Sequence, residues 1–573
     1  MAGISNGGAN RIHTTEGLKT ANAAAAGSTN RKGGWKSAIF IIFVEMAERF
    51  SYYGIAGNLI TYLTTVLGQP TATAARNVNT FQGVSAVFPI FGAFVADSYA
   101  GRFKTIVVSN VIYILGLILL VVASTPSFRH HGWLFFVALY LISVGEGGHK
   151  PCVQAFAADQ FPEEFPEEKE VKSSFFNWWY LGIVVGATLA VLVVIYVEDF
   201  VGWTVGYGIL TAATVLALVV FLVGSRTYCK EAPVGSPFTK VAQVVVAAVR
   251  KRGVSEARDA HGIYVYDHDV SILDNKERIY HALARTDQFR FLDKAAIVDE
   301  RDASSEKRDP WRLCSVSQAE EVKLLLRLIP IWLCCLPFAA SIAQLGTYFT
   351  KQGATLNRSI ASFHFPPASF QVVTSVTILV SVAGYDRIFL PAVRRISGKR
   401  SGITVLQRIG VGLFLSAAAM AVAGLVETKR LRVAAENDLL DSPKSTLPMQ
   451  IWWLAPQYVM IGLTDVFTVI GLQELFYDQM PVEMRSIGAA LYISVVGVGH
   501  FLSGALITIV QGISARSGNE WLVDNINRAH VNNFYWVLAG LGAINLCFFV
   551  FAAKAFIYKK ITEPVAMDKS EKV

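Results

Sequence analysis

Long apolar runs recur along the whole chain, and they constrain its fold more than any other feature. A run of about 18 or more mostly apolar residues can cross the hydrocarbon core of a bilayer as a helix. Backbone polar groups inside that core must be satisfied within the protein, which favours helices. Hydrophobic residues make up 53% of the chain and charged residues 16%, against about 25% charged in soluble domains. The sequence therefore predicts an all-α, multi-pass protein whose first partner is the lipid bilayer.

Twelve predicted spans fall into two sets of six. The longest hydrophilic stretch, 225–321, separates the sets and has mixed charge. Two halves joined in this way are typical of a transporter with a central site between them, although helix number alone leaves a channel or a membrane enzyme open. The spans lie near residues 37–66, 77–99, 104–124, 132–160, 173–197, 204–224, 322–350, 367–391, 402–426, 450–478, 486–513 and 531–558. The predicted domains are a disordered cytoplasmic tail (1–33), an N-terminal six-helix bundle (34–224), a cytoplasmic linker (225–321), a C-terminal six-helix bundle (322–560) and a cytoplasmic tail (561–573).

An even number of spans places both termini on one side of the membrane, and basic residues indicate which side. Short loops rich in Lys and Arg face the cytoplasm. Lys36 precedes span 1, Lys559 and Lys560 follow span 12, and further basic residues follow spans 2 and 8. Both termini are therefore predicted to be cytoplasmic. The net charge of +8 is explained by such loops, so we expect no nucleic-acid partner. We expect the plasma membrane, with the vacuolar membrane as the alternative.

Span 1 contains three charges in the stretch VEMAERFSYYG, namely Glu45, Glu48 and Arg49. At about 1.5 Å per residue, they lie roughly 12–18 Å into a hydrocarbon core that is about 30 Å thick. Spacings of three and four place them on one helix face. That face cannot meet lipid, where each charge would cost about 2.5 kcal/mol or more. A structural ion pair is one interpretation. Two carboxylates and one arginine leave a surplus acid, which favours proton uptake and release.

Two further charges lie inside predicted spans. Lys150 in span 4 belongs to EGGHKPCVQAFAADQF, and Glu474 in span 10 belongs to GLQELFYDQMP. Lys150 could instead snorkel towards the inner surface, and Glu474 could lie near the inner end of its span. Glu146 and His149 are more ambiguous and could be polar groups in helix packing.

These segments together resemble the proton-coupled oligopeptide transporter family of the major facilitator superfamily. The plant branch, the nitrate transporter/peptide transporter family, is the more similar. The motif ExxER followed by FSYYG resembles the first-helix signature. Further signatures are GAFVADSYAGRFKTI, GGHKPCVQAFAADQF, SSFFNWWYLGI and GLQELFYDQMP. The resemblance covers about residues 35 to 560 and implies twelve helices in two six-helix halves.

The resemblance implies roles for most of these residues. The first-helix Glu45, Glu48 and Arg49 would serve proton coupling. Lys150 would pair with them and face the substrate. One departure is at span 7, where some nitrate-transporting relatives have a histidine ligand and this chain has Ile342; this removes one argument for nitrate without excluding it. The other implied lining residues of the substrate cavity are Glu474, Tyr52 and Tyr53, although core packing is an equal alternative for the two tyrosines.

The loop between spans 2 and 3 matches the superfamily's loop motif. It contains Asp97, Gly101, Arg102 and Lys104. Charge pairs among these residues could form and break as the two halves rock, which would make the loop part of the gate. The basic residues could instead only set the topology, and both roles can hold together.

The function predicted from these observations is proton-driven symport by alternating access. The substrate would be nitrate, a short peptide or another small, often anionic, plant metabolite. A facilitator of the same fold at an internal membrane, which does not use the proton gradient, is the main alternative. We find no HExxH motif or nucleophile elbow, so we expect no enzyme activity, no cofactor and no catalytic metal.

Overall fold

A computed structural model describes the chain over residues 33–128, 131–161, 166–230, 235–253, 283, 285–303, 309–360, 363–397, 403–480 and 485–559. Structural statements below refer to these ranges. The predicted tail 561–573, and all but the last residue of the predicted tail 1–33, lie outside them.

The N-terminal half consists of six helical spans, each at a position predicted from the sequence. Several spans are built from successive segments, including π-helical turns (η2 and η3) and a 3₁₀ turn (η4). The segments are α2 (Trp35–Thr65); α3 (Thr71–Val87), α4 (Pro89–Val95) and η2 (Ala96–Ala100); α5 (Arg102–Ser124); α6 (Gly132–Ala158); α7 (Pro166–Leu189), η3 (Ala190–Val194) and α8 (Ile195–Phe200); and α9 (Trp203–Val223) with η4 (Gly224–Arg226).

The C-terminal half also has six helical spans at the predicted positions. They are α13 (Val316–Cys334), α14 (Leu336–Ile342), η6 (Leu345–Phe349) and α15 (Thr350–Ala354); η7 (Pro367–Gln371), α16 (Val372–Gly384), η8 (Tyr385–Phe389) and α17 (Leu390–Ser397); α18 (Val405–Glu436); η9 (Ile451–Leu454) and α19 (Ala455–Gln479); α20 (Arg485–Arg516); and α21 (Val531–Ala555). The first of these spans is bent by 44°.

Ten of the twelve spans in the described ranges are long and apolar enough to cross a membrane, and two are not. Within the described ranges, nine helices are long and apolar enough to cross a membrane, and the bent pair in span 7 makes a tenth. The remaining two spans are α2 and α6. They are also the helices that contain Glu45, Glu48, Arg49 and Lys150. The chain is thus an all-α membrane protein, and the two spans that depart from the apolar pattern, α2 and α6, contain charges near their middles.

Span 9 differs from its prediction. The sequence predicts its end at residue 426 and a mixed-charge loop beyond it, but α18 continues to Glu436. Its N-terminus is fixed by a capping box, in which Thr404 and Gln407 satisfy each other's backbone amides. Glu427 and Arg430 on the added turns are fully buried. Charged residues at this end were read as loop, whereas they form a polar network inside the C-terminal half.

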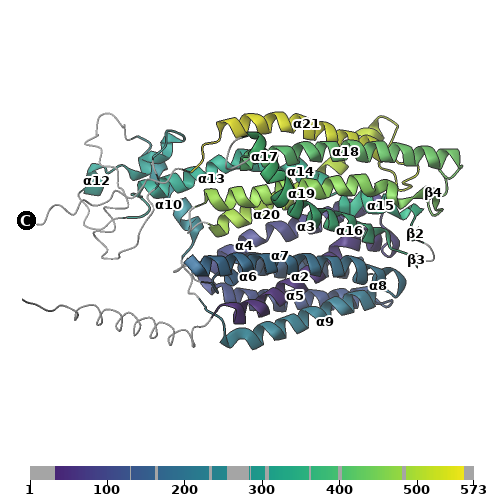
Figure 1. Ribbon diagram of the computed structural model, residues 1–573, viewed down its shortest axis with the longest axis horizontal. Helices are drawn as coiled ribbons and strands as arrows, with labels where there is room; N and C mark the ends of the chain where they lie inside the picture. The colour runs from purple at the N-terminus through teal and green to yellow at the C-terminus, as the bar shows by residue number, and fades with distance from the viewer. Residues whose placement is uncertain are drawn as a thin grey trace, which may run out of the picture.

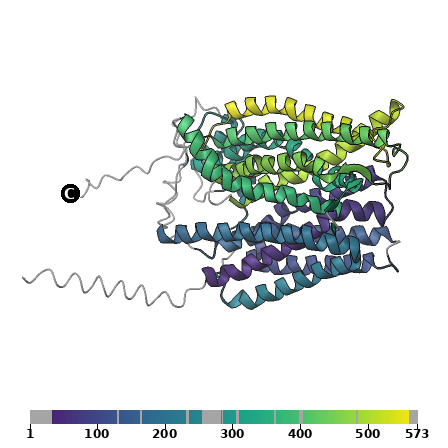
Figure 2. The same ribbon diagram turned by 45° about the vertical axis from the view of Figure 1, so that its right-hand side comes forward.

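The two halves lie side by side with their helices parallel to the long axis of the molecule. In Figure 1 the purple and blue helices of the N-terminal half occupy the lower part, and the green and yellow helices of the C-terminal half occupy the upper part. Figure 2 shows the same division after a turn of 45°. Within the halves, α5 packs along α6 and α18 packs against α19 and α21; between them, α3 packs along α20.

Close packing of glycines fixes the position of α6. A Cβ on Gly148 would overlap the side chain of Ser109 on α5, and a Cβ on Gly92 of α4 would overlap the backbone of Gly147. Small residues allow helix backbones to approach closely in membranes. The glycines around Lys150 therefore hold α6 tightly against α5 and α4, which fixes where its polar side chains lie.

The described part of the predicted linker forms a small folded unit. It contains α10 (Pro237–Arg250), η5 (Arg290–Ala296) and α12 (Glu300–Ala303), and α10 packs against η5 and α13. Lys251 pairs with Asp302 at 2.5 Å, and Arg312 pairs with the same carboxylate at 2.8 Å. Lys323 on α13 pairs with Asp293 of η5 at 2.5 Å. The unit is therefore fastened to the start of the C-terminal half. We call this end of the bundle the linker end.

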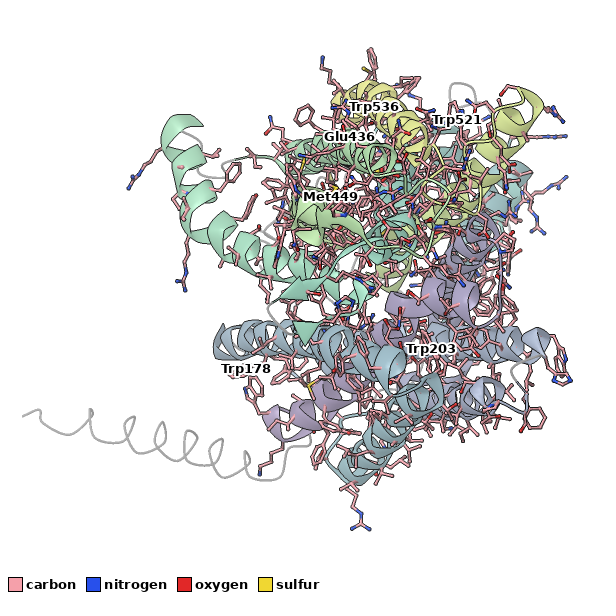
Figure 3. The ribbon with its side chains drawn as sticks, turned by 90° about the vertical axis from the view of Figure 1, so that its right-hand side faces the viewer. Trp178, Trp203, Glu436, Met449, Trp521 and Trp536 are labelled. Carbon is pink, nitrogen blue, oxygen red and sulfur yellow. The ribbon has the colours of Figure 1, made fainter. Side chains whose placement is uncertain are left out.

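The opposite end, called the far end, has the connections 66–70, 355–366 and 517–530. Two short strand pairs lie there, formed by β1 (Leu356–Asn357) with β4 (Leu447–Gln450) and by β2 (Ser359–Ile360) with β3 (Phe363–His364). Figure 3 views the molecule from this end, where Met449 and Trp521 are labelled.

Hydrogen bonds join the two halves in the far half of the bundle. Asp524 accepts hydrogen bonds from the amide and the hydroxyl of Thr71, at 2.9 and 3.1 Å. Lys351 Nζ donates to Thr64 Oγ1 at 3.2 Å. Other pairs in this part are Arg76 with Gln511, Asn79 with Ser503, Gln371 with Gly57, and Ser369 with Val191. The conformation is thus tied together at the far end.

Candidate functional site

The centre of the N-terminal half contains a buried group of charged side chains. These residues lie near the midpoints of α2, which has 31 residues, and α6, which has 27. All of the side chains are buried or half-buried. The group, called the α2–α6 cluster, comprises Glu45, Glu48 and Arg49 from α2 and Glu146, His149 and Lys150 from α6.

Arg49 lies between the two carboxylates of α2. Its Nε–H donates to Glu45 Oε1 at 2.8 Å. The same Nε is 2.9 Å from Glu48 Oε2, but neither oxygen of Glu48 accepts a hydrogen bond from the described residues. Because Nε has a single hydrogen, its contact with Glu48 is electrostatic only. Glu45 is therefore the carboxylate of the two that accepts a hydrogen bond from Arg49.

His149 faces the cluster from α6. Its Nε2 is 3.9 Å from Glu45 Oε2, and its side chain is 1% exposed. On the other side of the ring, Asn110 Nδ2 of α5 lies 2.9 Å from His149 Nδ1 and also donates to Ile106 O at 2.8 Å. An amide nitrogen can only donate, so Nδ1 is the acceptor and the ring hydrogen is on Nε2. That hydrogen points into the cluster.

Lys150 pairs with its own helix. Its Nζ contacts Glu146 Oε1, one turn earlier, and lies 4.2 Å from the centre of the Tyr52 ring. The expected pair between Lys150 and the α2 carboxylates is not formed in this conformation, since neither Glu45 nor Glu48 lies within ion-pair distance of it. Glu146 is in reach because residues four apart lie on one helix face.

The cluster has more acids than cations. It contains three carboxylates, on Glu45, Glu48 and Glu146, and two permanent cations, on Arg49 and Lys150. With His149 neutral, one negative charge is left over. A buried unpaired charge is costly, so the cluster is set to bind one positive charge.

A metal ion is a poor candidate for that charge. Ligand atoms of Glu45, Glu48 and His149 lie within 4.8 Å of one another, close enough for shared coordination. However, the guanidinium of Arg49 lies within 2.9 Å of both carboxylates, where a metal would have to approach them. A proton, which needs no coordination sphere, fits the space better.

Two tyrosines follow the cluster along α2. Tyr52 stacks on Phe81 with ring centres 6.4 Å apart and contacts Lys150 through its face. Tyr53 makes an edge contact with Tyr52 and is 37% exposed. It also lies near Asp465 of α19. The two predicted cavity tyrosines are thus placed beside the cluster, and Tyr53 faces the other half.

Asp465 is a candidate that the sequence analysis missed. It lies near the middle of the 25-residue α19, and its Oδ1 is buried with no hydrogen-bond partner among the described residues. Tyr53 and Tyr180 of the N-terminal half lie within range of its electrostatic field. The sequence does contain the signal, since an ionisable residue in the middle of a span indicates function by default, and Asp465 lies closer to the middle of the span than Glu474 does.

Glu474 lies apart from the α2–α6 cluster. It is five residues from the end of α19, its side chain is 44% exposed, and its Oε2 is 3.2 Å from Arg408 Nη1. Arg408 in turn lies over the ring of Tyr385 at 4.3 Å. Ile342, where some relatives have a histidine, is half-buried and packs against apolar clusters of the C-terminal half.

The loop motif between spans 2 and 3 forms a separate group at the linker end. Arg102 Nη1 pairs with Asp159 of α6 at 2.5 Å, and its Nε is 3.6 Å from Asp97. Gly101 has φ of 76°, a conformation that favours glycine. Lys104 is exposed. Arg102 therefore joins spans 2, 3 and 4 at one point, and the gating role of the loop stays a prediction.

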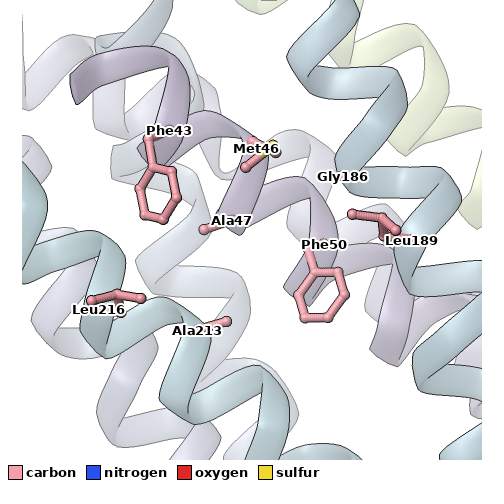
Figure 4. A pocket seen from close by; sticks show the side chains of 8 residues that line it. All are labelled: Phe43, Met46, Ala47, Phe50, Gly186, Leu189, Ala213 and Leu216. Carbon is pink, nitrogen blue, oxygen red and sulfur yellow. The ribbon is translucent and has the colours of Figure 1, made fainter. Parts of the chain in front are cut away.

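A small cavity of about 120 Å³ lies between α2, α7 and α9 (Figure 4). Its lining is apolar throughout, with Phe43, Met46, Phe50, Leu189 and Leu216 among the contributors. It contains no group that could bind an ion or a proton, so we do not assign it to the site.

A second buried ion pair lies in the C-terminal half. Arg430 is bidentate to Glu427, with both contacts at 2.7 Å, and neither side chain is exposed. All five N–H groups of Arg430 have acceptors, which include Asn527 and Thr355. Glu427 also accepts from Gln352 at 2.6 Å. We call this group the α18 network; its members are Glu427, Arg430, Gln352, Thr355, Gln457, Asn527 and Tyr535.

Comparison with known proteins agrees with this architecture. The profile of the POT family matches residues 103–523. The chain is 54% identical to Protein NRT1/PTR FAMILY 5.4 of Arabidopsis thaliana over 93% of this chain and 96% of that protein. It is 46% identical to Protein NRT1/PTR FAMILY 5.10 of the same plant, over 92% and 94% of the two chains.

The fold is shared with solved transporters of the same family. The crystal structure of the POT family transporter PepTSo matches with a TM-score of 0.68, over 91% of this chain and 98% of that one, at 20% identity. Both kinds of comparison describe membrane transporters rather than enzymes. The chain therefore belongs to the POT family of membrane transporters, together with the NRT1/PTR family proteins of Arabidopsis thaliana.

Proposed function

We propose that this transporter is a proton-driven symporter of small, often anionic metabolites, with nitrate and short peptides as the first candidates. The observation that supports it most is the charge balance of the α2–α6 cluster. Three carboxylates face two cations in a buried site, so uptake of one proton brings the cluster to neutrality. The group is expensive to maintain as mere structure, because one charge stays uncompensated.

Protonation of Glu45 or Glu48 couples to substrate through Arg49. A protonated carboxyl holds the guanidinium less tightly than a carboxylate does. Arg49 can then interact with an anionic substrate group, and Lys150 can do the same if the substrate displaces Glu146. Proton release on the other side restores the pairs and favours return of the empty carrier.

Asp465 extends the site to the other half. Tyr53 and Tyr180 lie within range of its electrostatic field, so the cationic side and an acidic side meet near the interface of the halves. A short peptide, with a carboxylate and an ammonium group, could engage both sides. Nitrate could engage only the cationic side, and Ile342 offers it no ligand.

The far end is proposed as the closed external gate. With both termini in the cytoplasm, the linker end is the inner end and the far end is outside. The hydrogen bonds of Asp524 with Thr71 and of Lys351 with Thr64 then close the outside while substrate exchanges with the inside. The plasma membrane is the proposed location, and a fluorescent fusion would distinguish it from the vacuolar membrane.

Transport assays test the coupling. Uptake of nitrate and of dialanine should be measured in cells that express the protein, at several external pH values and with a protonophore. We expect uptake to rise as external pH falls and accumulation to collapse with the protonophore. Saturable uptake that responds to neither treatment would instead identify a facilitator that does not use protons.

A cross-link tests alternating access. Thr64→Cys with Lys351→Cys places two thiols where the far end is hydrogen-bonded, and closure by a bifunctional reagent should stop uptake. Reduction of a reducible linker should restore it. Full activity in the cross-linked protein would mean that the far end does not need to open.

A further inference from the structure

His149 is the one member of the α2–α6 cluster whose role the charge balance does not explain. Its ring is 1% exposed, and Nε2 has no hydrogen-bond partner among the residues described. Nε2 is 3.9 Å from Glu45 Oε2, which is slightly longer than a hydrogen bond. The ring therefore presents a hydrogen to Glu45 across a short gap.

Asn110 keeps the ring neutral. Its amide nitrogen lies 2.9 Å from Nδ1 and 2.8 Å from the Ile106 carbonyl, which uses both amide hydrogens. A charged ring would carry a hydrogen on Nδ1 as well, and that hydrogen would face an N–H donor. Turning the Asn110 amide over would place its oxygen against the Ile106 oxygen. The surroundings therefore favour neutral His149 with its hydrogen on Nε2.

The charged groups around the ring lie on α2 and α6. Glu45 and Arg49 face it from α2, and Lys150 lies on its own helix. The contact from α5 is the neutral Asn110. From the other half, Tyr492 of α20 faces Glu45 and Arg49. Because a nitrogen of His149 also lies within 4.8 Å of a carboxylate oxygen of Glu48, two carboxylates and two cations surround the ring, and the contact with Asn110 determines its neutral form.

Glu45 and Glu48 differ in their donors. Glu45 accepts from Arg49 and faces the hydrogen of His149. Glu48 accepts from neither, although a nitrogen of His149 lies within 4.8 Å of one of its oxygens, and its further neighbours include Tyr52, Tyr113 of α5 and Glu146. Hydrogen bonds to a carboxylate favour its ionised form. Of the two, only Glu45 has a hydrogen bond that protonation would weaken.

We propose that His149 is a positioning residue that keeps Glu45 ionised through its Nε2 hydrogen, so that Glu48 is the carboxyl that binds the transported proton. This inference rests on the proposed function. It assigns different roles to two glutamates that the first-helix motif presents as equivalent. His149 itself does not carry the proton.

Infrared difference spectroscopy of the protein in liposomes, titrated with pH, locates the proton without any substrate. We expect a carboxylic-acid band that forms as pH falls, is lost in Glu48→Gln and is kept in Glu45→Gln. In His149→Leu, Glu45 loses the hydrogen that Nε2 presents to it. The carboxylic-acid band that Glu45 contributes should therefore form at a pH about half to one unit higher than the Glu45 band of the wild type. His149→Gln places an amide N–H near the position of Nε2 and should restore the wild-type titration.

His500→Gln is the matched control. His500 is also buried, but its Nδ1 bonds to the Val496 carbonyl on its own helix, α20, so the titration should not change. A band that survives in Glu48→Gln but is lost in Glu45→Gln would overturn the inference, as would a band lost in His149→Gln. Uptake with and without a protonophore is measured on the same wild-type protein; failure there contradicts the proposed symport, whereas failure of the titration contradicts only the role of His149.

Discussion

The α2–α6 cluster and the α18 network both contain buried glutamate and arginine side chains, but they differ in how many of the polar atoms are hydrogen-bonded. In the α18 network, every N–H of Arg430 has an acceptor and the ion pair with Glu427 is bidentate. In the α2–α6 cluster, Glu48 and His149 Nε2 have no hydrogen-bond partner among the described residues. In both groups the glutamate and arginine are largely buried and lie three or four residues apart on one helix. Neither burial nor spacing therefore distinguishes a structural ion pair from a functional one.

The difference shows what a proton-binding site needs. A satisfied pair has one arrangement of low energy, and protonation would break several bonds at once. An incomplete cluster can gain or lose a proton with little rearrangement, because few bonds depend on its charge. Completeness of hydrogen bonding around the arginine, rather than the presence of buried charge, therefore separates the α18 network from the α2–α6 cluster, where we propose proton coupling.

Removal of the arginine from the closed network should have the largest effect on stability. Arg430→Ala leaves Glu427 as an uncompensated buried charge, which costs about 3–5 kcal/mol. Thermal unfolding of the purified protein would measure it. Arg432→Ala, two residues away on the exposed face of α18, is the matched control and should be near neutral. Equal stability of the two variants would contradict the structural role of the network.

The same Glu→Gln change should distinguish the two groups. Glu427→Gln removes the partner of a satisfied arginine and should lower stability by about 3 kcal/mol or more. Glu48→Gln removes a carboxylate that accepts no hydrogen bond and should change stability by no more than about 1 kcal/mol. Chemical or thermal unfolding of both variants provides the comparison. A large loss in Glu48→Gln would make the α2–α6 cluster a structural network as well.

Lys150 should be coupled energetically to Glu146 rather than to the α2 carboxylates. Lys150→Ala alone leaves Glu146 unpaired and should reduce the amount of folded protein, whereas Lys150→Ala with Glu146→Gln should recover part of it. The double-mutant cycle measures the interaction. Lys150→Ala with Glu45→Gln serves as the comparison; if this pair recovers more, Lys150 belongs with α2 despite the observed contact.

Tyr52 should make a smaller contribution. Tyr52→Leu removes the ring face under Lys150 and should weaken the site by about 0.5–2 kcal/mol, while Tyr52→Phe keeps the ring and should have little effect. The affinity for substrate and the thermal stability of both variants would test this. Identical losses in the two variants would assign the role to the hydroxyl.

The sequence predicted the fold well because the bilayer leaves few alternatives. Each predicted span coincides with a helical segment, and Glu45, Glu48 and Arg49 were identified since charge at mid-membrane is costly. The errors have physical causes. Glu427 and Arg430 looked like a loop because a mixed-charge segment resembles a solvated one, and their partners come from distant helices. The pairing of Lys150 with the α2 carboxylates stays a prediction: in this conformation Lys150 contacts Glu146, and a motif does not show which neighbour a long side chain reaches.

Asp465 and His149 show what pattern alone does not resolve. Asp465 was overlooked beside Glu474, and only its unpartnered oxygen and the nearby tyrosines distinguish it. His149 was recognised as ambiguous, and its direction depends on Asn110, 39 residues earlier in the chain. Whether a polar group is satisfied is a property of the three-dimensional neighbourhood, which spacing along one helix does not contain.

Accumulation driven by a pH gradient alone tests the central claim most directly. Wild-type protein and Glu48→Gln would be reconstituted in liposomes with an alkaline interior and no substrate gradient, with dialanine and nitrate as probes. The account predicts that the wild type concentrates a probe until a protonophore is added. Glu48→Gln should exchange that probe across the membrane without concentrating it. Concentration by Glu48→Gln, or wild-type uptake that ignores the gradient, would contradict the assignment of coupling to the α2–α6 cluster.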